Sequence, residues 1–489
     1  MTRICVSVCE KTIDALESAA IRASESADIV ELRIDCLTRL EDLKPVLNRI
    51  SCPVILTFRP DEQGGHRVLD HQARKLFWNS APQTEWWDVE SDLALETNWP
   101  RIIISHHDFS RVPEDITQIY EQLAATPAHV LKIAVQANDV VDCIPVFQLL
   151  DRARSEGRDM IAIAMGNAGL ATRILGPSRG AFLTYAALEE ENATAPGQIT
   201  AQKLRSVYNV EQIDRETMIC GLAGQPVMHS VSPHMHNAAF RTAGINGVYL
   251  PLEVHDVKTF VERMVHPRTR EFDWNLRGLS VTAPHKSSVM EFLDWIDPTA
   301  QEIGAVNTIV VDDDKLLGFN TDAAGFIEPL LKVIDSLSGL RVAVIGAGGA
   351  ARAAVWALLR QQATVTLFAR DVAKARSLKQ VFDVSYEPLS SASFADYDLV
   401  INATPLGSGE LIEQVPVTAE QLHGASVAYD LVYNPIETRF LQEASKAGCR
   451  PVHGLEMLIA QAKNQFELWT GQTPSMNVMS DAAVAALDH

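Results

Sequence analysis

Short apolar runs rich in β-branched residues alternate with longer stretches of helical periodicity over the first 210 residues. The runs are ICVSV from Ile4, IVELRI from Ile29, VILTF from Val54, WWDVE from Trp86, RIIIS from Arg101, HVLKIAV from His129, MIAIAM from Met160 and AFLTY from Ala181. This alternation predicts parallel strands joined by helices. Eight strands make a (β/α)8 TIM barrel, which we expect over residues 1–212.

The pattern changes after residue 200. The helical segment Ala201–Val210 is the predicted last helix of the barrel, and the polar stretch Glu211–Glu216 is the predicted linker. A new apolar run, MICGLAG, begins at Met218. We therefore predict that a second α/β module starts near this point.

Within that module, VAVIGAGGAAR (Val342–Arg352) is an apolar run that ends in a glycine-rich turn and continues as alanine-rich sequence. It predicts a strand, a tight turn and a helix. Gly346 allows the turn, and Gly348 lets backbone N–H groups approach a pyrophosphate at the helix N-terminus. A second strand, Thr364–Phe368, follows at the distance of a βαβ unit. We predict a Rossmann-type dinucleotide site; a purely structural glycine turn is the alternative.

Composition narrows the possible partners. A formal net charge of −20 without a basic run excludes nucleic acid and anionic membranes. The seven cysteines are scattered and form no C-x-x-C pair, so we expect neither a disulfide framework nor a metal site, and a reducing compartment fits. The sequence shows no signal-peptide pattern and no apolar stretch long enough for a bilayer. We therefore expect a cytoplasmic protein.

Polar side chains stand at the predicted C-terminal ends of the barrel strands, where active sites of such barrels lie. They are Glu31, Arg33, Arg59, Glu90, His107 and Lys132. Lys132 lies in the apolar run LKIAV, where desolvation would favour the neutral amine that attacks a carbonyl. A lysine that extends its ammonium group to solvent is the alternative. His107 could shuttle protons, and arginines including Arg173 could hold a carboxylate and hydroxyls.

The motifs of this half resemble type I 3-dehydroquinate dehydratase over nearly all of residues 1–210. They are ELR at Glu31, FRPDEQGG from Phe58, SHHDF from Ser105, LKIAV from Leu131 and TAPGQ from Thr194. The resemblance implies that Lys132 forms an imine with the substrate ketone, and that His107 removes the C2 proton and assists loss of the C1 hydroxyl. Glu31 would orient His107. The implied substrate-holding residues are Arg33, Arg59, Arg173, Thr194 and Gln198.

Two positions depart from that family's pattern. Gln63 stands where many members have glutamate, and Thr194 stands where many have serine; both keep hydrogen-bonding capacity. His106 is the rival for the catalytic histidine, but the family pattern x-H-D-F selects His107.

The second module resembles shikimate dehydrogenase over residues 217–489. The motifs are HSVSP from His229, SVTAPHK from Ser280, GAVNT from Gly304, GFNTDAAG from Gly318, YDLVYNP from Tyr429 and GLEMLIAQA from Gly454. The resemblance implies a substrate domain over 217–325, completed by 451–489, and a nucleotide domain over 326–450. Lys286 and Asp322 would form the catalytic pair. The implied substrate contacts are Ser230, Ser232, Thr282, Asn307, Tyr433 and Gln461. Alone, the two serines would be interpreted as helix caps.

The cofactor predicted for this module is NADP. Arg370 and Lys374 match the family pattern for a ribose 2′-phosphate, although Ala369 replaces an asparagine and Asp371 replaces a threonine. Pro405, in INATPLG, stands where serine is usual. The predicted cofactor-binding residues are Gly346, Gly348, Gly349, Ala350, Arg370, Lys374 and Thr404.

Together the two resemblances imply consecutive reactions of aromatic amino acid biosynthesis. The barrel would dehydrate 3-dehydroquinate to 3-dehydroshikimate, and the second module would reduce that product to shikimate. One alternative is an aldolase-type Schiff-base barrel joined to a quinate-preferring, catabolic dehydrogenase. Another is a metabolite sensor without activity, which would not need Lys132, His107, Lys286 and Asp322 together. The sequence makes no prediction of oligomeric state.

Overall fold

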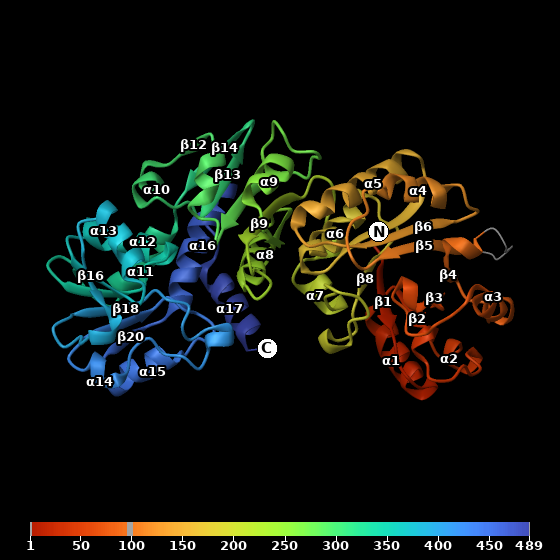
Figure 1. Cartoon of the computed structure of the whole chain (residues 1–489), viewed down its shortest axis with the longest axis horizontal. Helices are drawn as coiled ribbons and strands as arrows, with labels where there is room; N and C mark the ends of the chain where they lie inside the picture. Colours follow the sequence, from red (N-terminus) through yellow and green to blue (C-terminus); the bar gives the residue numbers. More distant parts are fainter. Residues whose placement is uncertain (1, 95–100, 489) are drawn as a thin grey trace.

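The computed structural model describes residues 2–94 and 101–488. An N-terminal barrel, coloured red to yellow, lies beside an elongated C-terminal half (Figure 1). The green segment, which follows the barrel in sequence, lies between the barrel and the blue C-terminal segments (Figure 1). Among the described residues, no helix combines the length and the apolar character needed to cross a membrane.

All eight expected strands form the barrel. They are β1 (Ile4–Val8), β2 (Ile29–Arg33), β3 (Val54–Thr57), β4 (Trp86–Glu90), β5 (Ile102–Asp108), β6 (Val130–Gln136), β7 (Asp159–Met165) and β8 (Thr184–Ala186). The strands are parallel, in the order β7-β6-β5-β4-β3-β2-β1-β8. A bridge between Met160 of β7 and Ala181, just before β8, joins the two ends of the sheet. The α/β barrel predicted from the apolar runs is confirmed.

The helices between these strands cover the outside of the barrel. They are α1 (Ile13–Ser26), α2 (Lys44–Leu47), α3 (His71–Ser80), α4 (Ile116–Ala124), α5 (Cys143–Ser155), α6 (Leu170–Leu175) and α7 (Ala201–Ser206). Successive strand residues face opposite sides: Leu131 and Ile133 pack toward the helices, whereas Val130 and Ala134 pack inside the barrel. Lys132 shares the inward face with Val130. Alternation therefore points this lysine into the barrel.

The next module has a mixed six-stranded sheet in the order β10-β9-β11-β13-β14-β12. Its strands are β9 (Met218–Gly224), β10 (Gly247–Glu253), β11 (Leu276–Val281), β12 (Trp295–Ile296), β13 (Thr308–Asp312) and β14 (Lys315–Phe319). Its helices are α8 (Ser232–Ala243), α9 (Val257–Phe260), α10 (Pro298–Ile303) and α11 (Asp322–Leu331). Only β13 runs antiparallel to its neighbours among the described pairs.

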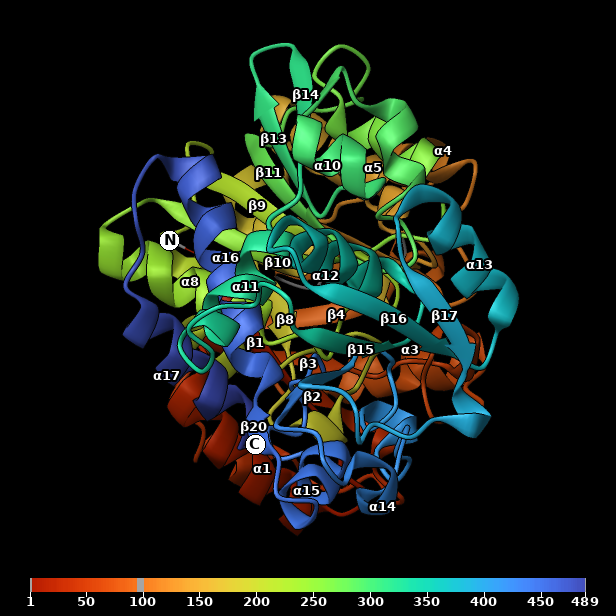
Figure 2. The same ribbon diagram turned by 90° about the vertical axis from the view of Figure 1, so that its left-hand side faces the viewer.

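The third sheet is parallel throughout, in the order β17-β16-β15-β18-β19-β20. Its strands are β15 (Arg341–Ile345), β16 (Thr364–Ala369), β17 (Ser385–Pro388), β18 (Leu399–Asn402), β19 (Val427–Asp430) and β20 (Arg450–Val452). Its helices are α12 (Gly349–Arg360), α13 (Val372–Val381), α14 (Ala419–Leu422) and α15 (Arg439–Lys446). This order is that of a doubly wound Rossmann sheet, which confirms the prediction. In Figure 2 this sheet lies in front of the barrel.

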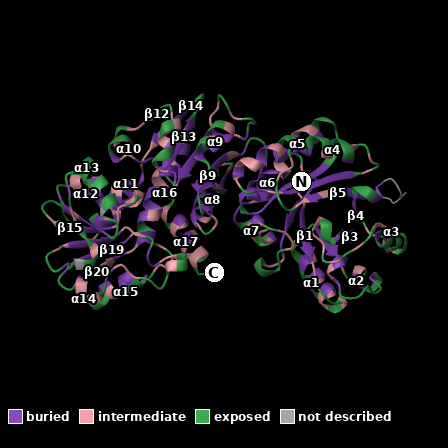
Figure 3. Ribbon diagram, in the orientation of Figure 1, coloured by how far each residue is buried: buried purple, intermediate pink, exposed green. Residues whose placement is uncertain are grey.

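The chain then returns to the middle module. Helices α16 (Gly454–Thr470) and α17 (Met476–Leu487) follow β20. Phe466 and Trp469 of α16 share a core with Phe240 of α8 and Tyr249 of β10. Figure 3 shows that buried residues concentrate in the strands of both halves, with exposed residues along the outer loops and helix faces. The C-terminal helices thus complete the core of the middle module.

A small aromatic contact joins the barrel to the middle module. The rings of Phe147 on α5 and Phe272 lie 5.1 Å apart. The guanidinium of Arg179 lies over both rings and donates to Asp151 at 2.5 Å. The contact places α5 beside the loop that precedes β11.

Two expectations about local structure are wrong. The helix expected over Ala201–Val210 ends at Ser206; Asn209 then adopts a φ of 51°, and a short 3-10 turn follows at Val210–Gln212. Cys9 and Cys36 form a disulfide, although the scattered cysteines predicted none. The two residues are 27 positions apart but lie in neighbouring loops of the barrel, an arrangement that sequence spacing does not reveal.

Candidate active sites

A pocket lies at the C-terminal ends of the barrel strands. It is lined by every catalytic and substrate-holding residue that the family resemblance implied for this half: Glu31, Arg33, Arg59, His107, Lys132, Arg173, Thr194 and Gln198. Glu90, which also ends a strand, does not line it. Phe109, Met165 and Tyr185 also line it, whereas His106 does not. The barrel thus brings residues from most of its strands to one place.

Lys132 lies in a polar cage and not in the apolar surroundings expected from LKIAV. Its Nζ donates to Asp88 at 2.6 Å and to the hydroxyl of Tyr185 at 3.0 Å, and lies 3.6 Å from Glu31. The apolar neighbours in sequence face the opposite side of β6, which explains the difference. The alternative of a lysine that reaches solvent is also wrong, since Lys132 is 5% exposed.

Asp88 holds two cations at the bottom of the pocket. Its carboxylate accepts from Lys132 and, at 2.8 Å, from Arg59. Although burial opposes ionisation, Arg59 and Lys132 lower the pKa of Asp88 to about 2. Asp88 therefore stays ionised and forms ion pairs with both Arg59 and Lys132.

His107 is a buried, neutral imidazole. Burial lowers its pKa well below the usual value, and the charges of Arg59 and Lys132 lower it further. Arg59 Nη1 lies 2.8 Å from His107 Nδ1. Because a guanidinium can only donate, Nδ1 is the acceptor and Nε2 carries the proton. The backbone N–H of His107 donates to Gln63 at 2.8 Å, which gives the glutamine a positioning role.

Arg173 is a buried cation without an acidic partner among the described residues. It is 1% exposed, and its guanidinium donates only to the carbonyls of Tyr185 and Pro196, at 3.4 and 3.2 Å. Burial lowers its pKa to about 10. An uncompensated buried charge is costly, so this side chain is suited to an anionic substrate group.

We expected Glu31 to orient His107, but its contacts are with other residues. The carboxylate oxygens of Glu31 accept hydrogen bonds from the hydroxyls of Ser7 and, at 2.8 Å, Thr57. Its charged neighbour is Lys132. Glu31 stands on β2 and projects toward the lysine across the barrel. In the same pocket, Thr194 donates to Gln198 through its backbone N–H and its hydroxyl, at 2.9 and 3.2 Å.

The second candidate site is built around Lys286 and Asp322. Lys286 follows β11, and Asp322 is the first residue of α11. Their Nζ and Oδ2 atoms lie 2.5 Å apart, and Asn307 donates to the other oxygen of Asp322 at 2.8 Å. A β-carbon on Gly349 would lie 3.6 Å from Lys286 Cδ. The lysine thus stands next to the glycine-rich turn of the nucleotide domain.

The other predicted substrate contacts come from separate elements. Gln461 on α16 lies beside α11, because a β-carbon on Gly325 would stand 2.7 Å from that of Gln461. Ser230 accepts from the backbone N–H of Ser232 at 3.2 Å. Burial raises the pKa of Tyr433, and a hydrogen bond with Ser230 opposes the rise.

The glycine-rich turn has the form of a pyrophosphate site. Gly346 adopts a φ of 119°, and a β-carbon there would lie 2.9 Å from the carbonyl oxygen of Ala403. Gly348 caps α12 and has open space where its side chain would be. A phosphate could occupy this space at the helix N-terminus. Thr404, after the neighbouring β18, donates to Asn402 at 2.6 Å.

Arg370 and Lys374 lie at the far end of the same site. Both are exposed, one directly after β16 and the other on α13. Asp371 accepts from the backbone N–H groups of Ala373 and Lys374, at 3.0 and 3.4 Å. Aspartate and threonine are both good helix caps, which explains the departure from the family pattern.

Comparison with known proteins agrees with this geometry. The type I 3-dehydroquinase family model matches residues 4–215, and the shikimate dehydrogenase substrate binding domain matches residues 222–309. The shikimate / quinate 5-dehydrogenase model matches residues 329–425, and the shikimate 5'-dehydrogenase C-terminal domain matches residues 454–483. A chloroplastic bifunctional 3-dehydroquinate dehydratase/shikimate dehydrogenase of Arabidopsis thaliana is 32% identical, over 96% of this chain and 82% of its own. The chain belongs to this bifunctional family.

Two further relatives support membership of the family. The shikimate biosynthesis protein AroDE of Chlamydia pneumoniae is 29% identical over 95% of both chains. The shikimate dehydrogenase of Thermus thermophilus, solved with NADP(H) and shikimate, is 37% identical with a TM-score of 0.50. It covers 55% of this chain and all of its own. The chain therefore combines the lyase and the NADP-dependent oxidoreductase of the family.

Sequence reasoning missed polar residues behind each site of this bifunctional enzyme. In the barrel these are Asp88 and Asp35; the latter binds Arg33 through two hydrogen bonds of 2.9 and 2.8 Å. In the C-terminal half, Gln465 connects Ser280 to the backbone of residue 307. Gln465 lies one helical turn after Gln461, and this spacing was an available signal.

Proposed function

We propose that the chain dehydrates 3-dehydroquinate in the barrel and reduces the resulting 3-dehydroshikimate to shikimate with NADPH in the C-terminal half. The observation that carries the first activity is a single pocket lined by Lys132, His107 and an uncompensated Arg173. For the second, it is the Lys286–Asp322 pair beside the glycine-rich turn.

In the barrel, the neutral amine of Lys132 attacks the carbonyl carbon of the substrate ketone, and the ketone oxygen leaves as water when the imine forms. Arg173 binds the substrate carboxylate, since it is the buried cation without an acidic partner. Arg59 donates a hydrogen bond to Nδ1 of His107, which is the atom that must accept the C2 proton. A substrate group that binds Arg59 and draws it away would free Nδ1 for this step. That proton then leaves with the C1 hydroxyl as water, and hydrolysis restores the lysine.

In the C-terminal half, hydride transfer to the carbonyl carbon is the chemistry that NADPH supplies when it is bound. Lys286 donates the proton that the carbonyl oxygen requires. Asp322 holds the ammonium and, together with Asn307, binds a substrate hydroxyl. Ser230, Ser232 and Tyr433 converge on a second hydroxyl or the carboxylate. Arg370 and Lys374 hold the ribose 2′-phosphate.

The division into 1–212, 217–325 with 451–489, and 326–450 is part of the proposal. It is supported by three separate sheets and by α16 and α17 completing the core of the middle module. A tether between the two sites raises the local concentration of the shared intermediate. The cytoplasmic location stays a prediction from the sequence.

The test is to mix the purified chain with 3-dehydroquinate and NADPH. Oxidation of NADPH then requires both sites, because the dehydratase must supply the ketone that is reduced. Lys132→Ala should abolish this coupled reaction, and added 3-dehydroshikimate should restore it. Efficient oxidation of quinate, without reduction of 3-dehydroshikimate, would favour the catabolic alternative. Binding without turnover of either substrate would favour a sensor.

A further inference from the structure

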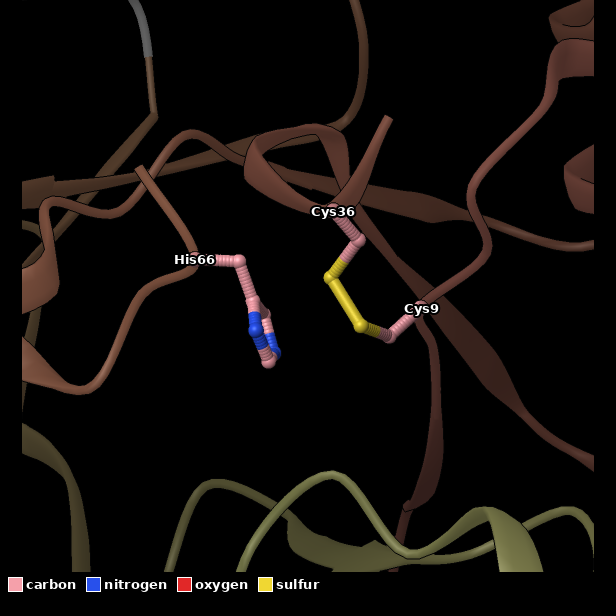
Figure 4. A group of neighbouring side chains, drawn as sticks. All are labelled: Cys9, Cys36 and His66. Atoms are coloured by element: carbon pink, nitrogen blue, oxygen red, sulfur yellow. A yellow bond between two sulfur atoms is a disulfide. The ribbon is translucent and has the colours of Figure 1, made fainter. Parts of the chain in front are cut away.

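A disulfide and a histidine lie at the rim of the barrel, apart from the substrate pocket. Cys9 follows β1, and Cys36 ends the 3-10 turn Ile34–Cys36 after β2. The ring of His66, from the loop after β3, lies alongside the sulfur bridge (Figure 4) and within 4.8 Å of both sulfur atoms. The cysteines are half-buried and His66 is exposed, so solvent reagents can reach the bridge.

The other cysteines do not share this environment. Cys5, Cys143, Cys220 and Cys449 are buried, Cys52 is half-buried, and all are free thiols. Burial raises the pKa of each of them. Thiols in such surroundings react poorly, because the thiolate is the nucleophile. The rim disulfide is therefore the pair in this chain that is open to exchange.

Asp35 connects the disulfide to the substrate pocket. Its buried carboxylate accepts from Arg33 at 2.9 and 2.8 Å and from the backbone N–H of His66 at 3.1 Å. It also directly precedes Cys36 in the sequence. The loop that contains His66 also contains Gln63, whose side-chain oxygen accepts a hydrogen bond from the backbone N–H of His107. The disulfide therefore anchors the turn that ends at Cys36, and Asp35 in that turn holds both Arg33 and the loop of His66 by hydrogen bonds.

We propose that Cys9, Cys36 and His66 form a redox site at which a dithiol reduces the disulfide, and that reduction weakens substrate binding in the barrel. The proposal rests on the dehydratase function proposed above. Without the covalent link, the turn that holds Cys36 and Asp35 can move relative to β1. Arg33, which depends on Asp35 for its orientation, then loses its fixed geometry.

The exchange balances without any further reactant. One thiolate of the dithiol attacks a sulfur of the bridge, the bond between the two Sγ atoms breaks, and the leaving thiolate takes a proton. The imidazole of His66, which lies alongside the bridge, is the nearby group that can deliver that proton. The second thiolate of the dithiol attacks the mixed disulfide and releases the other cysteine, which is protonated from solvent. Two electrons and two protons reach the cysteine pair, and the dithiol becomes a disulfide.

The test compares oxidised and dithiothreitol-reduced full-length chain. Reduction should add two reactive thiols per chain and lower dehydratase kcat/KM about fivefold or more, mainly through KM. Reductase activity in the same sample should not change, since its site lies in the other half. A Cys9→Ser/Cys36→Ser variant should match the reduced chain and ignore oxidants, and Cys52→Ser, the control, should keep the full response. His66→Asn should reach the same end states but be reduced more slowly.

Other outcomes overturn the proposal. Equal dehydratase constants in both states, with the thiol count confirmed, would leave the disulfide purely structural. A reduced chain that binds one Zn²⁺ tightly, and loses it in His66→Asn, would make the cluster a metal site instead. If neither state dehydrates 3-dehydroquinate, the dehydratase function itself fails. The thiol count and the rate effect of His66 would still decide whether the disulfide exchanges.

Discussion

Both halves of the molecule pair a lysine with a carboxylate, but they build the pair in different ways. Lys132 Nζ lies 2.6 Å from Asp88, and Lys286 Nζ lies 2.5 Å from Asp322. The first lysine stands on a barrel strand, and its partners stand on other strands of the same closed sheet. The second stands in a loop and meets a helix terminus. Its side chain is 19% exposed, against 6% for Lys132.

The difference follows from the two chemistries. A lysine that forms an imine must bond covalently to its substrate, so a rigid barrel that holds the amine in place is an advantage. A lysine that only donates a proton must share its substrate with a cofactor held by another domain. Lys286 lies in a loop next to the glycine-rich turn, where substrate and cofactor can meet. In the proposed function, the lysine is the nucleophile of one half and the proton donor of the other, and the carboxylate holds it in both.

The largest expected effect distinguishes a nucleophile from a binding residue. Lys132→Ala should lower dehydratase kcat by more than about 10⁴-fold, because no other amine can form the imine. The reductase should keep its activity. The measurement is ultraviolet absorbance of the conjugated enone product. Borohydride with 3-dehydroquinate should also leave an adduct on the peptide that contains Lys132; an adduct on another lysine would contradict the assignment.

A smaller loss is expected at the second lysine, since it moves only a proton. Lys286→Ala should lower reductase kcat by about 10²–10⁴-fold and change KM for 3-dehydroshikimate much less. Steady-state rates of NADPH oxidation measure this. Asp322→Asn should lower the rate and weaken substrate binding, and the double variant should be little worse than Lys286→Ala. A normal kcat with a raised KM would reduce Lys286 to a binding residue.

The strands were easier to predict from the sequence than the surroundings of Lys132 in the barrel pocket. Strand runs in both halves are continuous and β-branched, so all eight barrel strands and the β15–β16 unit were found from the sequence. The motifs also named the charged residues of the barrel pocket, but not Met165 and Tyr185, which line it as well. In contrast, the surroundings of Lys132 depend on which side chains face inward from β2, β4 and β8. Those contacts cross the barrel and leave no trace in local sequence.

The errors have the same origin. Glu31 was assigned to His107 by family resemblance, yet its neighbours across the barrel are Ser7, Thr57 and Lys132. Cys9 and Cys36 were considered unpaired because their spacing carries no motif. Loops that follow adjacent parallel strands meet at one rim of a barrel, so tertiary topology alone brings these residues together.

Cofactor choice gives a third and weaker test, confined to one half. Arg370→Ala should weaken NADPH binding about 10- to 150-fold, through loss of a charge-assisted contact to the 2′-phosphate. NADH affinity should change little, because that cofactor lacks the phosphate. Fluorescence titration of both cofactors measures the ratio. Lys374→Ala provides the matched comparison one helical turn away. Equal weakening of both cofactors would indicate that Arg370 supports the fold of the loop.

The smallest expected effect concerns the pH dependence of stability that one buried carboxyl group in each half produces. Glu90 lies 3.2 Å from Arg74 and 3.7 Å from Arg59, yet burial outweighs both arginines and raises its pKa to about 7. In the nucleotide domain, burial raises the pKa of Asp430 to about 6. Each folded site thus keeps a proton that the unfolded chain releases at lower pH. The stability that each of these groups contributes to the folded chain therefore falls as the pH rises. For Glu90 the fall occurs between its ordinary pKa of 4.5 and its folded pKa of about 7.

Glu90→Gln should remove this pH dependence from the barrel. Its gain in stability over the parent chain should grow with pH across that window, by at most about 1.4 kcal/mol per pH unit. Hydrogen–deuterium exchange of peptides covering β4, compared between variant and parent at each pH, measures the gain. Peptides covering β19 are the internal reference, and only Asp430→Asn should change them. A gain that shrinks with rising pH would mean that Arg59 and Arg74 stabilise the ionised carboxylate after all. Glu90 would then act as the ionised partner of the two arginines, as Asp322 is the partner of Lys286 in the other half.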